Sequence, residues 1–282
     1  MERNKLVKPF LKWAGGKRQL ASEIIANYLP AQYNTYYEPF LGGGAIFFEL
    51  QPEKAVVNDR NSELINCYEV IRDSVNQLIE DLRKHQNTED YYYKVRDWDR
   101  KKNYQSMSTI ERASRIIFLN KTCYNGLFRV NSKGYFNVPF GRYKNPNILD
   151  DAVLKAVSCY LNNPDIKILN GDFETAVEEA QYGDFVYLDP PYHPISNTAY
   201  FTGYNMNGFN EDEQIRLKKT VDELNKRGCQ VLLSNADADF IRDLYKDYEI
   251  KKVYATRAIN SNPIKRGKIQ EVLVMNSYKC KL

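Results

Sequence analysis

Short apolar segments rich in β-branched and aromatic residues recur along the chain, and they alternate with stretches whose apolar positions have helical spacing. The apolar segments lie at 36–40, 55–57, 166–169, 184–188, 230–234, 250–255 and 271–275. Segments of this length and composition predict strands, and the amphipathic stretches between them predict helices. Repeated alternation of strand and helix indicates an α/β fold with a largely parallel sheet.

Polar residues and glycines mark the ends of several predicted helices. A long amphipathic helix is predicted from Ser62 to Leu82. Ser108 and Glu111 have the spacing of a capping box and open another helix. Asn210 is expected to cap a helix that ends at Gly228. These signals fix where the helices begin and end more firmly than periodicity alone does.

The stretch 62–150 lacks the strand–helix alternation found on either side of it. It is predicted to be mostly helical, with a connection between helices at 91–104 that is rich in tyrosine and charge. Residues 129–136 have the pattern of a β-hairpin in which Gly134 supplies a positive φ. We therefore expect residues 1–61 and 151–282 to form one discontinuous domain, into which residues 62–150 are inserted as a second.

The net charge of +4 is modest, but positive charge is concentrated in one block. Every charged residue from Arg112 to Leu149 is basic: Arg112, Arg115, Lys121, Arg129, Lys133, Arg142 and Lys144. Aromatic residues are interleaved with them, among them Tyr124, Phe128 and Tyr143. Basic residues mixed with rings are typical of a surface that binds nucleic acid, although a solvated basic face over an aromatic core is the simpler alternative.

Other function classes are disfavoured by the composition. No apolar run is long enough to cross a bilayer, and the N-terminus has no signal-peptide core, so a cytoplasmic protein is expected. The five cysteines and two histidines are scattered, which predicts neither a disulfide framework nor a metal site. Gly15-Gly16-Lys17 resembles a P-loop only superficially, because the Ser or Thr after the lysine is absent.

The tetrapeptide Asp189-Pro190-Pro191-Tyr192 follows the predicted strand at 184–188 and is the strongest candidate for chemistry. The two prolines end the strand and stiffen the turn, because neither can donate a backbone hydrogen bond. In an open parallel sheet, ligands bind at the carboxyl ends of the strands. A planar amine could donate to Asp189 and to the Pro190 carbonyl while its ring stacks on Tyr192. Taken alone, a simple strand-terminating turn is nearly as good an interpretation.

A second candidate site is the glycine turn Gly42-Gly43-Gly44 between a predicted strand and a helix. Such a turn brings the backbone close to a nucleotide-like cofactor. The next predicted strand ends at Asp59, fifteen positions after Gly44, near the interval at which such folds bind ribose hydroxyls. These residues leave a dinucleotide and an S-adenosyl cofactor both open.

Five motifs in order extend these observations over nearly the whole chain. They are Lys12-Trp13-Ala14-Gly15-Gly16-Lys17, Glu38-Pro39-Phe40-Leu41-Gly42-Gly43-Gly44-Ala45, Asn58-Asp59, Asn125–Arg129 with Phe136–Tyr143, and Asp189-Pro190-Pro191-Tyr192. In this order the chain resembles the Dam family of DNA adenine-N6 methyltransferases of the alpha arrangement. The resemblance implies a Rossmann-like S-adenosylmethionine-dependent methyltransferase sheet with an inserted, mostly helical DNA-recognition domain.

The resemblance also implies roles for individual residues. Asp189, Pro190 and Tyr192 are expected at the catalytic centre. The cofactor S-adenosyl-L-methionine is expected to bind Trp13, Lys17, Phe40, Gly42, Gly44, Asp59, Asp172, Phe173 and Asp189. DNA contacts are expected from Tyr124, Asn125, Leu127, Arg129, Pro139, Arg142 and Lys144. Because the block around Arg129 contains no acidic residue, its guanidinium is expected to be free to contact a partner outside the protein.

The implied reaction is methylation of adenine N6 in double-stranded DNA at GATC, with the target base flipped out of the duplex. No membrane or metal partner is expected, whereas a cognate restriction endonuclease for the same site and association with the nucleoid through DNA are compatible with this function. The alternatives are a dinucleotide-dependent oxidoreductase, a catalytically silent DNA-binding regulator, and a methyltransferase acting on RNA or on a protein amide. Cytosine-C5 methylation is disfavoured, because no proline precedes a cysteine.

Overall fold

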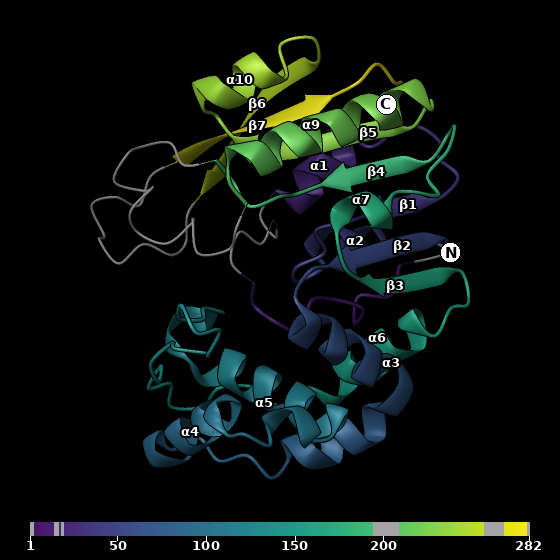
Figure 1. The fold of residues 1–282 in the computed structure, drawn as a ribbon. Coiled ribbons are helices and arrows are strands. Elements are labelled where there is room, and N and C mark those ends of the chain that lie inside the picture. The colour runs from purple at the N-terminus through teal and green to yellow at the C-terminus, as the bar shows by residue number, and fades with distance from the viewer. Residues whose placement is uncertain (1–2, 14–16, 18–19, 194–208, 257–267, 281–282) are drawn as a thin grey trace. The chain divides into compact units, whose positions relative to one another are not determined.

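The chain folds into two compact units, each assembled from separate stretches of the sequence (Figure 1). The computed structural model describes residues 3–13, 17, 20–193, 209–256 and 268–280. The first unit comprises Met1–Gly16, Gly42–Glu53 and Asp59–Asn170. The second comprises Lys17–Leu41, Lys54–Asn58 and Gly171–Leu282. The predicted insertion at 62–150 remains a prediction.

The first unit is mainly helical. Its helices are α2 (Ala45–Leu50), α3 (Ser62–Leu82), α4 (Glu89–Arg96), α5 (Thr109–Thr122) and α6 (Asp151–Leu161), and its strand is β3 (Ile166–Asn170). Short 3₁₀ turns cover Asp97–Arg100, Tyr104–Ser106 and Tyr124–Gly126. The connection predicted at 91–104 is therefore wrong in its first half, because α4 extends to Arg96. This helix has Thr88 as its N-terminal cap and the basic residues Lys94 and Arg96 in its last turn.

The second unit carries most of the strands. These are β1 (Tyr36–Glu38), β2 (Ala55–Asp59, whose last residue belongs to the first unit), β4 (Phe185–Leu188), β5 (Gln230–Ala236), β6 (Glu249–Thr256) and β7 (Lys268–Met275). Its helices are α1 (Ala21–Asn27), α7 (Phe173–Ala176), α9 (Glu211–Lys226) and α10 (Asp239–Leu244). The predicted strand–helix alternation is confirmed, although the helix expected from Phe173 to Ala180 ends at Ala176 in α7.

The strands form a seven-stranded sheet in the order β3-β2-β1-β4-β5-β7-β6. β1 pairs in parallel with β2 and β4, and β4 pairs in parallel with β5. β7 is antiparallel to both β5 and β6. The order reverses between β1 and β4, and ligands bind at such a switch point in open α/β sheets. The mixed α/β fold class is thus confirmed.

Burial explains why the central strands read as continuous apolar runs. All four residues of β4 are buried, and so are all residues of β5 except Gln230. A strand that is buried on both faces loses its alternation of polar and apolar positions. The sequence pattern therefore located these strands but gave no register for them.

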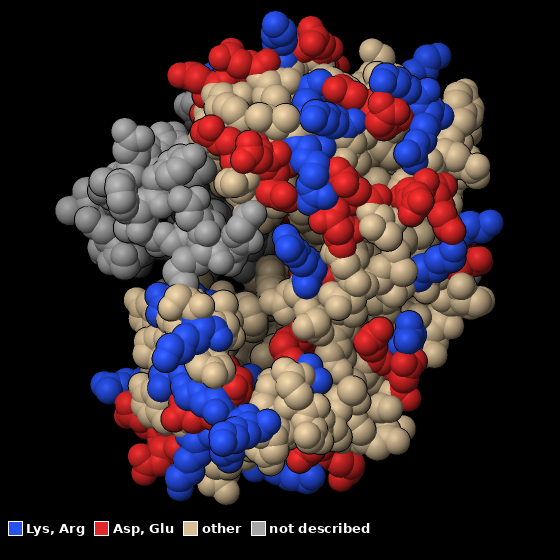
Figure 2. All heavy atoms as spheres, in the orientation of Figure 1, with Lys and Arg blue, Asp and Glu red and all other residues tan. Residues whose placement is uncertain are grey.

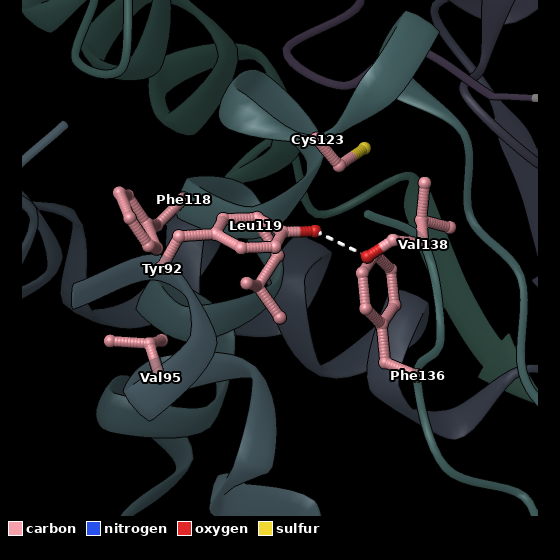
Figure 3. Close-up of a cluster of buried hydrophobic side chains, with 7 residues drawn as sticks. All are labelled: Tyr92, Val95, Phe118, Leu119, Cys123, Phe136 and Val138. Atoms are coloured by element: carbon pink, nitrogen blue, oxygen red, sulfur yellow. Dashed lines mark hydrogen bonds between the residues drawn. The ribbon is translucent and has the colours of Figure 1, made fainter. Parts of the chain in front are cut away.

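The first unit has an aromatic core of its own (Figure 3). It consists of Tyr92, Val95, Phe118, Leu119, Cys123, Phe136 and Val138, all buried. The Tyr92 hydroxyl donates to the Val138 carbonyl at 2.8 Å, which joins α4 to the chain after the hairpin. Phe136 and Val138 belong to the basic block, so part of that block's aromatic and apolar content serves the core.

Candidate functional site

The turn at Asp189 lies where the sequence analysis placed it, directly after the buried parallel strand β4. Pro190 is buried, whereas the Asp189 side chain keeps 19% of its surface exposed. Because strands β1, β4 and β5 run parallel, this turn lies at their carboxyl edge. A carboxylate held there by two prolines has little freedom to rotate away from a ligand.

Lys17 is drawn into this turn by two carboxylates. Its side chain is only 4% exposed, and its Nζ lies 3.0 Å from Asp189 Oδ1 and 3.2 Å from Glu271 Oε2. The same ammonium lies 4.2 Å from the ring centroid of Tyr192 and hydrogen-bonds to the Tyr192 hydroxyl. A buried lysine is stable only with such partners, because removing an unpaired charge from water is costly.

The Tyr192 hydroxyl is held from a second side. It is 2.7 Å from Ser234 Oγ and donates to Glu271 Oε2 at 2.9 Å. Sequence analysis did not single out Ser234 or Glu271. The available signal was a polar residue at the end of each apolar run, since Ser234 follows Leu233 in β5 and Glu271 precedes Val272 in β7.

Burial and the neighbouring Lys17 ammonium shift the pKa of Asp189 in opposite directions. Burial raises the pKa of Asp189 above its ordinary value, the Lys17 ammonium pulls it down, and the Glu271 carboxylate raises it. Burial also raises the pKa of Tyr192 well above its ordinary value, so this phenol stays neutral at physiological pH. Two carboxylates and one ammonium leave a net negative charge when all three are ionised.

A cluster of aromatic rings forms beside α7 in the same unit. Phe40 stacks on Phe173 at 5.3 Å between centroids, and Phe209 contacts both rings. Asp172 caps α7, since it accepts from the Glu174 N–H at 3.0 Å. It also forms a two-pronged ion pair with Arg216, with both contacts at 2.8 Å.

Arg216 was missed from the sequence because α9 lies far from Asp172 along the chain. Its guanidinium lies 4.2 Å from the Phe173 ring centroid and also pairs with Glu174 and Glu213. The cation thus fixes Asp172 and covers one aromatic face at the same time.

The predicted cofactor residues of the first unit form a second group. Asp59 Oδ2 accepts from the Gly42 N–H at 2.9 Å, and Asp59 Oδ1 accepts from the Asn61 N–H at 2.9 Å. Burial raises the pKa of Asp59, while these two backbone hydrogen bonds lower it. The acid and the glycine turn are therefore bonded to each other, a contact that their spacing alone did not predict.

Positive φ angles explain two of the glycines in the turn. Gly42 has φ of 50° and Gly44 has φ of 66°, a region that favours glycine. A Cβ at Gly42 would lie 2.9 Å from the Trp13 ring, and the Trp13 ring stacks on Phe128 at 4.8 Å. Trp13 is thus packed against the glycine turn within this unit.

The hairpin predicted at 129–136 is confirmed. Val130 and Phe136 form an antiparallel bridge, Asn131 donates its N–H to the Tyr135 carbonyl at 2.9 Å, and Gly134 has φ of 80°. The expectation of a free Arg129 guanidinium is wrong. Arg129 is exposed, but its Nε donates to Asn137 Oδ1 at 2.8 Å and its Nη2 donates to the Asn137 carbonyl at 3.2 Å.

Asn137 therefore occupies one edge of the guanidinium. The end-on edge, formed by Nη1 and Nη2, is the edge that matches a planar acceptor pair. Sequence reasoning considered only acidic partners for Arg129, and a neutral amide across a hairpin carries no charge signal.

The other predicted DNA contacts differ in exposure. Tyr124, Pro139, Arg142 and Lys144 are exposed, whereas Asn125 and Leu127 are partly buried. Leu127 packs against the aromatic core, and Arg142 lies 3.5 Å from Glu89. Lys and Arg side chains gather on the lower left of the view in Figure 2, where Figure 1 places α4 and α5.

The side chain of Asn120 ties the residues at 120–126 to the backbone of the N-terminal segment. Asn120 donates to the carbonyls of Lys12 and Gly126 at 2.7 and 3.1 Å, and it accepts from the Lys12 N–H at 2.8 Å. Asn125 and Gly126 have positive φ of 57° and 63°. A Cβ at Gly126 would lie 2.4 Å from the Lys12 side chain. The backbone around Tyr124 is thus held firmly within the first unit.

The sequence also predicts a polar loop at 201–208 and a basic loop with Arg257, Lys265, Arg266 and Lys268. Of these residues, all but Lys268 lie outside those that the structure describes. Within the residues that the structure describes, no helix is long and apolar enough to span a membrane. Over the same residues, no group of three or more His, Cys, Asp or Glu side chains is arranged to hold a metal ion.

Comparison with known proteins identifies the kind of enzyme that this geometry belongs to. Residues 13–259 match the family described as D12 class N6 adenine-specific DNA methyltransferase. The chain is 51% identical to a type II methyltransferase of Lactococcus lactis subsp. cremoris, over 98% of each chain. It is 47% identical to a type II methyltransferase of Methanocaldococcus jannaschii, over 96% of this chain and 99% of the relative. It is 34% identical to the DNA adenine methylase of Escherichia coli K12, over 95% of each.

Proposed function

The chain belongs to the D12 class N6 adenine-specific DNA methyltransferases, and we propose that its target is the adenine of GATC in duplex DNA. Enzyme class and DNA substrate follow from the family. The sequence GATC is implied by the resemblance to the Dam family, and the relatives named DNA adenine methylase support it. The relatives named type II methyltransferase are more similar, and they favour a cognate restriction endonuclease acting on the same site.

The observation that carries the proposal is the turn Asp189-Pro190-Pro191-Tyr192, held at the carboxyl edge of the parallel strands beside the buried Lys17. Adenine N6 is a poor nucleophile, because its lone pair is delocalised into the ring. In our proposal its two hydrogens are donated to the Asp189 carboxylate and the Pro190 carbonyl. These bonds favour the pyramidal nitrogen that attacks, and alignment in line with the methyl group supplies much of the rate.

Membership in the family implies S-adenosylmethionine as the methyl donor, and the residues present fit it. This cofactor supplies a methyl group on a positively charged sulfonium. Asp189, Glu271 and Lys17 together leave a net negative charge, which suits a cation. We propose that the cofactor is bound by Trp13, Lys17, Phe40, Gly42, Gly44, Asp59, Asp172, Phe173 and Asp189, and that Asp59 accepts from the ribose hydroxyls through the lone pairs left beside its two backbone bonds.

A base inside a duplex cannot reach a carboxylate in a protein turn, so the adenine must be flipped out. The proposed stacking surface is the ring of Tyr192. Lys17 occupies one face of that ring at 4.2 Å, so the base would stack on the other. The hydroxyl bonds of Tyr192 to Ser234 and Glu271 keep the ring in place for this contact.

Sequence recognition is proposed for the hairpin and the basic block of the first unit. Arg129, oriented by Asn137, presents its end-on edge to O6 and N7 of a guanine in the major groove. Leu127 and Pro139 supply apolar contact to a thymine methyl, while Tyr124 and Asn125 fill the space left by the flipped base. Arg142 and Lys144 contact phosphates, which position the protein without reading sequence.

A methyl-transfer assay with purified protein tests the proposal. Tritiated S-adenosylmethionine would be supplied with a duplex containing one GATC, and with a duplex of the same composition in which that site is scrambled. Transfer to the first duplex alone is expected. Asp189→Ala should abolish transfer while DNA binding, measured by fluorescence anisotropy, stays near that of the wild type. Substantial activity in Asp189→Ala would show that the catalytic assignment is wrong.

A further inference from the structure

Two buried side-chain amides lie beside the catalytic turn, within the second unit. Gln214 on α9 is 1% exposed, and Asn235 on β5 is fully buried. A buried amide is costly unless its donors and acceptor are satisfied. The partners of these two side chains include the backbone of the turn itself.

The hydrogen bonds run in one direction. Gln214 Nε2 donates to the Pro191 carbonyl at 2.9 Å, and Gln214 Oε1 accepts from Asn235 Nδ2 at 3.1 Å. Asn235 Oδ1 in turn accepts from the His193 N–H at 3.2 Å and from the Ala236 N–H at 2.8 Å. Two N–H groups point at Asn235 Oδ1, so rotating that amide by 180° would set donor against donor. The orientation of Gln214 follows from that of Asn235.

These hydrogen bonds hold the backbone on both sides of Tyr192. The carbonyl before Tyr192 and the N–H after it are both tied to this pair of amides. The hydroxyl of Tyr192 is separately held by Ser234 and Glu271. The two peptide units that set the direction of the Tyr192 ring are thus anchored to α9 and β5, and the same anchor limits rotation of the Pro190 carbonyl.

We propose that Gln214 and Asn235 are positioning residues for methyl transfer, which fix the Pro190 carbonyl and the Tyr192 ring through the backbone at Pro191 and His193. This inference rests on the catalytic role proposed above for the turn. In this proposal neither amide contacts the base or the cofactor. Their contribution is to keep the acceptors aligned, and a displacement of about 1 Å at such a position lowers a rate by about a hundredfold.

The directionality supplies a test that a merely structural role would not pass. Gln214→Glu is nearly isosteric, but an ionised glutamate cannot donate to the Pro191 carbonyl. A protonated glutamic acid can donate there. The single-turnover rate of Gln214→Glu is therefore expected to be about tenfold to a hundredfold below that of the wild type at pH 8. The ratio of the two rates should recover as the pH is lowered, with the Km for S-adenosylmethionine and the Kd for DNA little changed.

Gln230→Glu is the matched control. Gln230 lies at the other end of β5, and its Nε2 donates to the Gln32 carbonyl at 3.0 Å, away from the turn. This variant loses the same kind of donor, and its rate is expected to equal that of the wild type at every pH. An equal rate for Gln214→Glu, or a deficit that does not change with pH, would overturn the proposal.

Two further results keep the outcomes distinct. Rates are expressed per folded enzyme, with the folded fraction taken from circular dichroism. Should Gln214→Glu not fold, Gln214→Met carries the test, because it removes the donor without adding charge. We expect its rate to be at least about tenfold lower at every pH; a wild-type rate would overturn the inference. A wild-type protein that methylates no adenine would instead refute the proposed function.

Discussion

At the scale of single residues, the central feature is a carboxylate that must stay ionised in a buried place. Asp189 was identified from the sequence because two prolines and a tyrosine follow it. Glu271 and Ser234, which hold the Tyr192 hydroxyl, were not, because they lie 79 and 42 positions away from Tyr192, and spacing along the chain carries no information about such contacts. Local chemistry could be predicted from local sequence, whereas the charges that tune it depend on how the strands pair.

The raised pKa of Asp189 has a consequence for stability. A folded-state pKa above the unfolded value means that the folded protein binds this proton more tightly. The stabilisation from the protonated form is therefore complete below the ordinary pKa near 4 and is lost as the pH rises through the raised value. At neutral pH, ionised Asp189 costs stability.

Asp189→Asn should accordingly separate stability from activity. Asparagine cannot ionise, and Lys17 keeps Glu271 as a partner at 3.2 Å. We expect a higher Tm than that of the wild type at pH 7, with the advantage shrinking as the pH falls, and no methyl transfer. Differential scanning calorimetry over a pH series would measure this difference. A Tm advantage that grows at acid pH would contradict the stated direction.

Asp59 gives a second prediction at this scale. Asp59→Ala should weaken S-adenosylmethionine binding by about 1–3 kcal/mol, the usual worth of a hydrogen bond to a charged group. Asp59→Asn is the control, because its remaining oxygen can keep one of the bonds to Gly42 and Asn61. Isothermal titration calorimetry measures both variants. Equal affinity in Asp59→Ala and the wild type would mean that Asp59 only stabilises the glycine turn and does not contact the cofactor.

At the scale of elements, capping signals were the most reliable part of the sequence. The predicted capping box at Ser108 and Glu111 is present with both of its hydrogen bonds. The Asn210 cap is present, and Gly228 has φ of 78°. Helix α4 was missed because its tyrosines and charges obscure an apolar stripe, yet its Thr88 cap was a readable signal. A helix cap is a hydrogen bond between residues close in sequence, so it can be predicted without knowing the tertiary packing.

His85 contacts two helices of the first unit, α4 and α5, and supplies a test at this scale. Its ring stacks on Phe118 of α5 at 4.4 Å, and its nitrogens lie 3.0 Å from the Tyr91 hydroxyl and 2.9 Å from Ser114 Oγ. Burial lowers the pKa of His85 to about 4. The neutral ring therefore favours the folded state, and that contribution declines as the pH falls from about 6.5 to about 4.

Replacement by a group that does not titrate should remove this slope. In the wild type, the loss of unfolding free energy over this interval is expected to reach at most about 3 kcal/mol from His85. His85→Gln should lose less over the same interval, although it is less stable at neutral pH. Urea unfolding at a series of pH values makes the comparison. Parallel pH dependences in the two proteins would assign the slope to other groups.

At the scale of the whole molecule, the α/β class was predictable because buried parallel strands and amphipathic helices differ in length and composition. The packing within each unit was not. The basic block gives a clear case, since Phe136 and Val138 enter the core while Arg129 and Lys144 stay exposed. A block in which every charged residue is basic thus predicted a nucleic-acid partner, but it did not show which of its residues face solvent.

DNA binding should divide these basic residues into two kinds. Arg129→Ala is expected to relax discrimination at one guanine by about 1–3 kcal/mol, because a bidentate base contact is lost. Asn137→Ala should have a smaller effect in the same direction, since it removes the bond from Arg129 Nε to the Asn137 side chain and leaves the bond to the backbone carbonyl. Lys144→Ala should weaken binding to every sequence alike and lower the salt dependence. Fluorescence anisotropy with matched and mismatched duplexes would measure all three. A uniform loss in Arg129→Ala would assign it to phosphate.

The most direct test is to map modified bases in the DNA of cells that express this chain and have no adenine methylation of their own. Long-read sequencing is expected to find N6-methyladenine at GATC on both strands, and none in cells that express Asp189→Ala. Methylation of adenine at another sequence would leave the chemistry intact and refute the recognition residues. Absence of N6-methyladenine from cells that contain the folded protein would contradict the account at its centre.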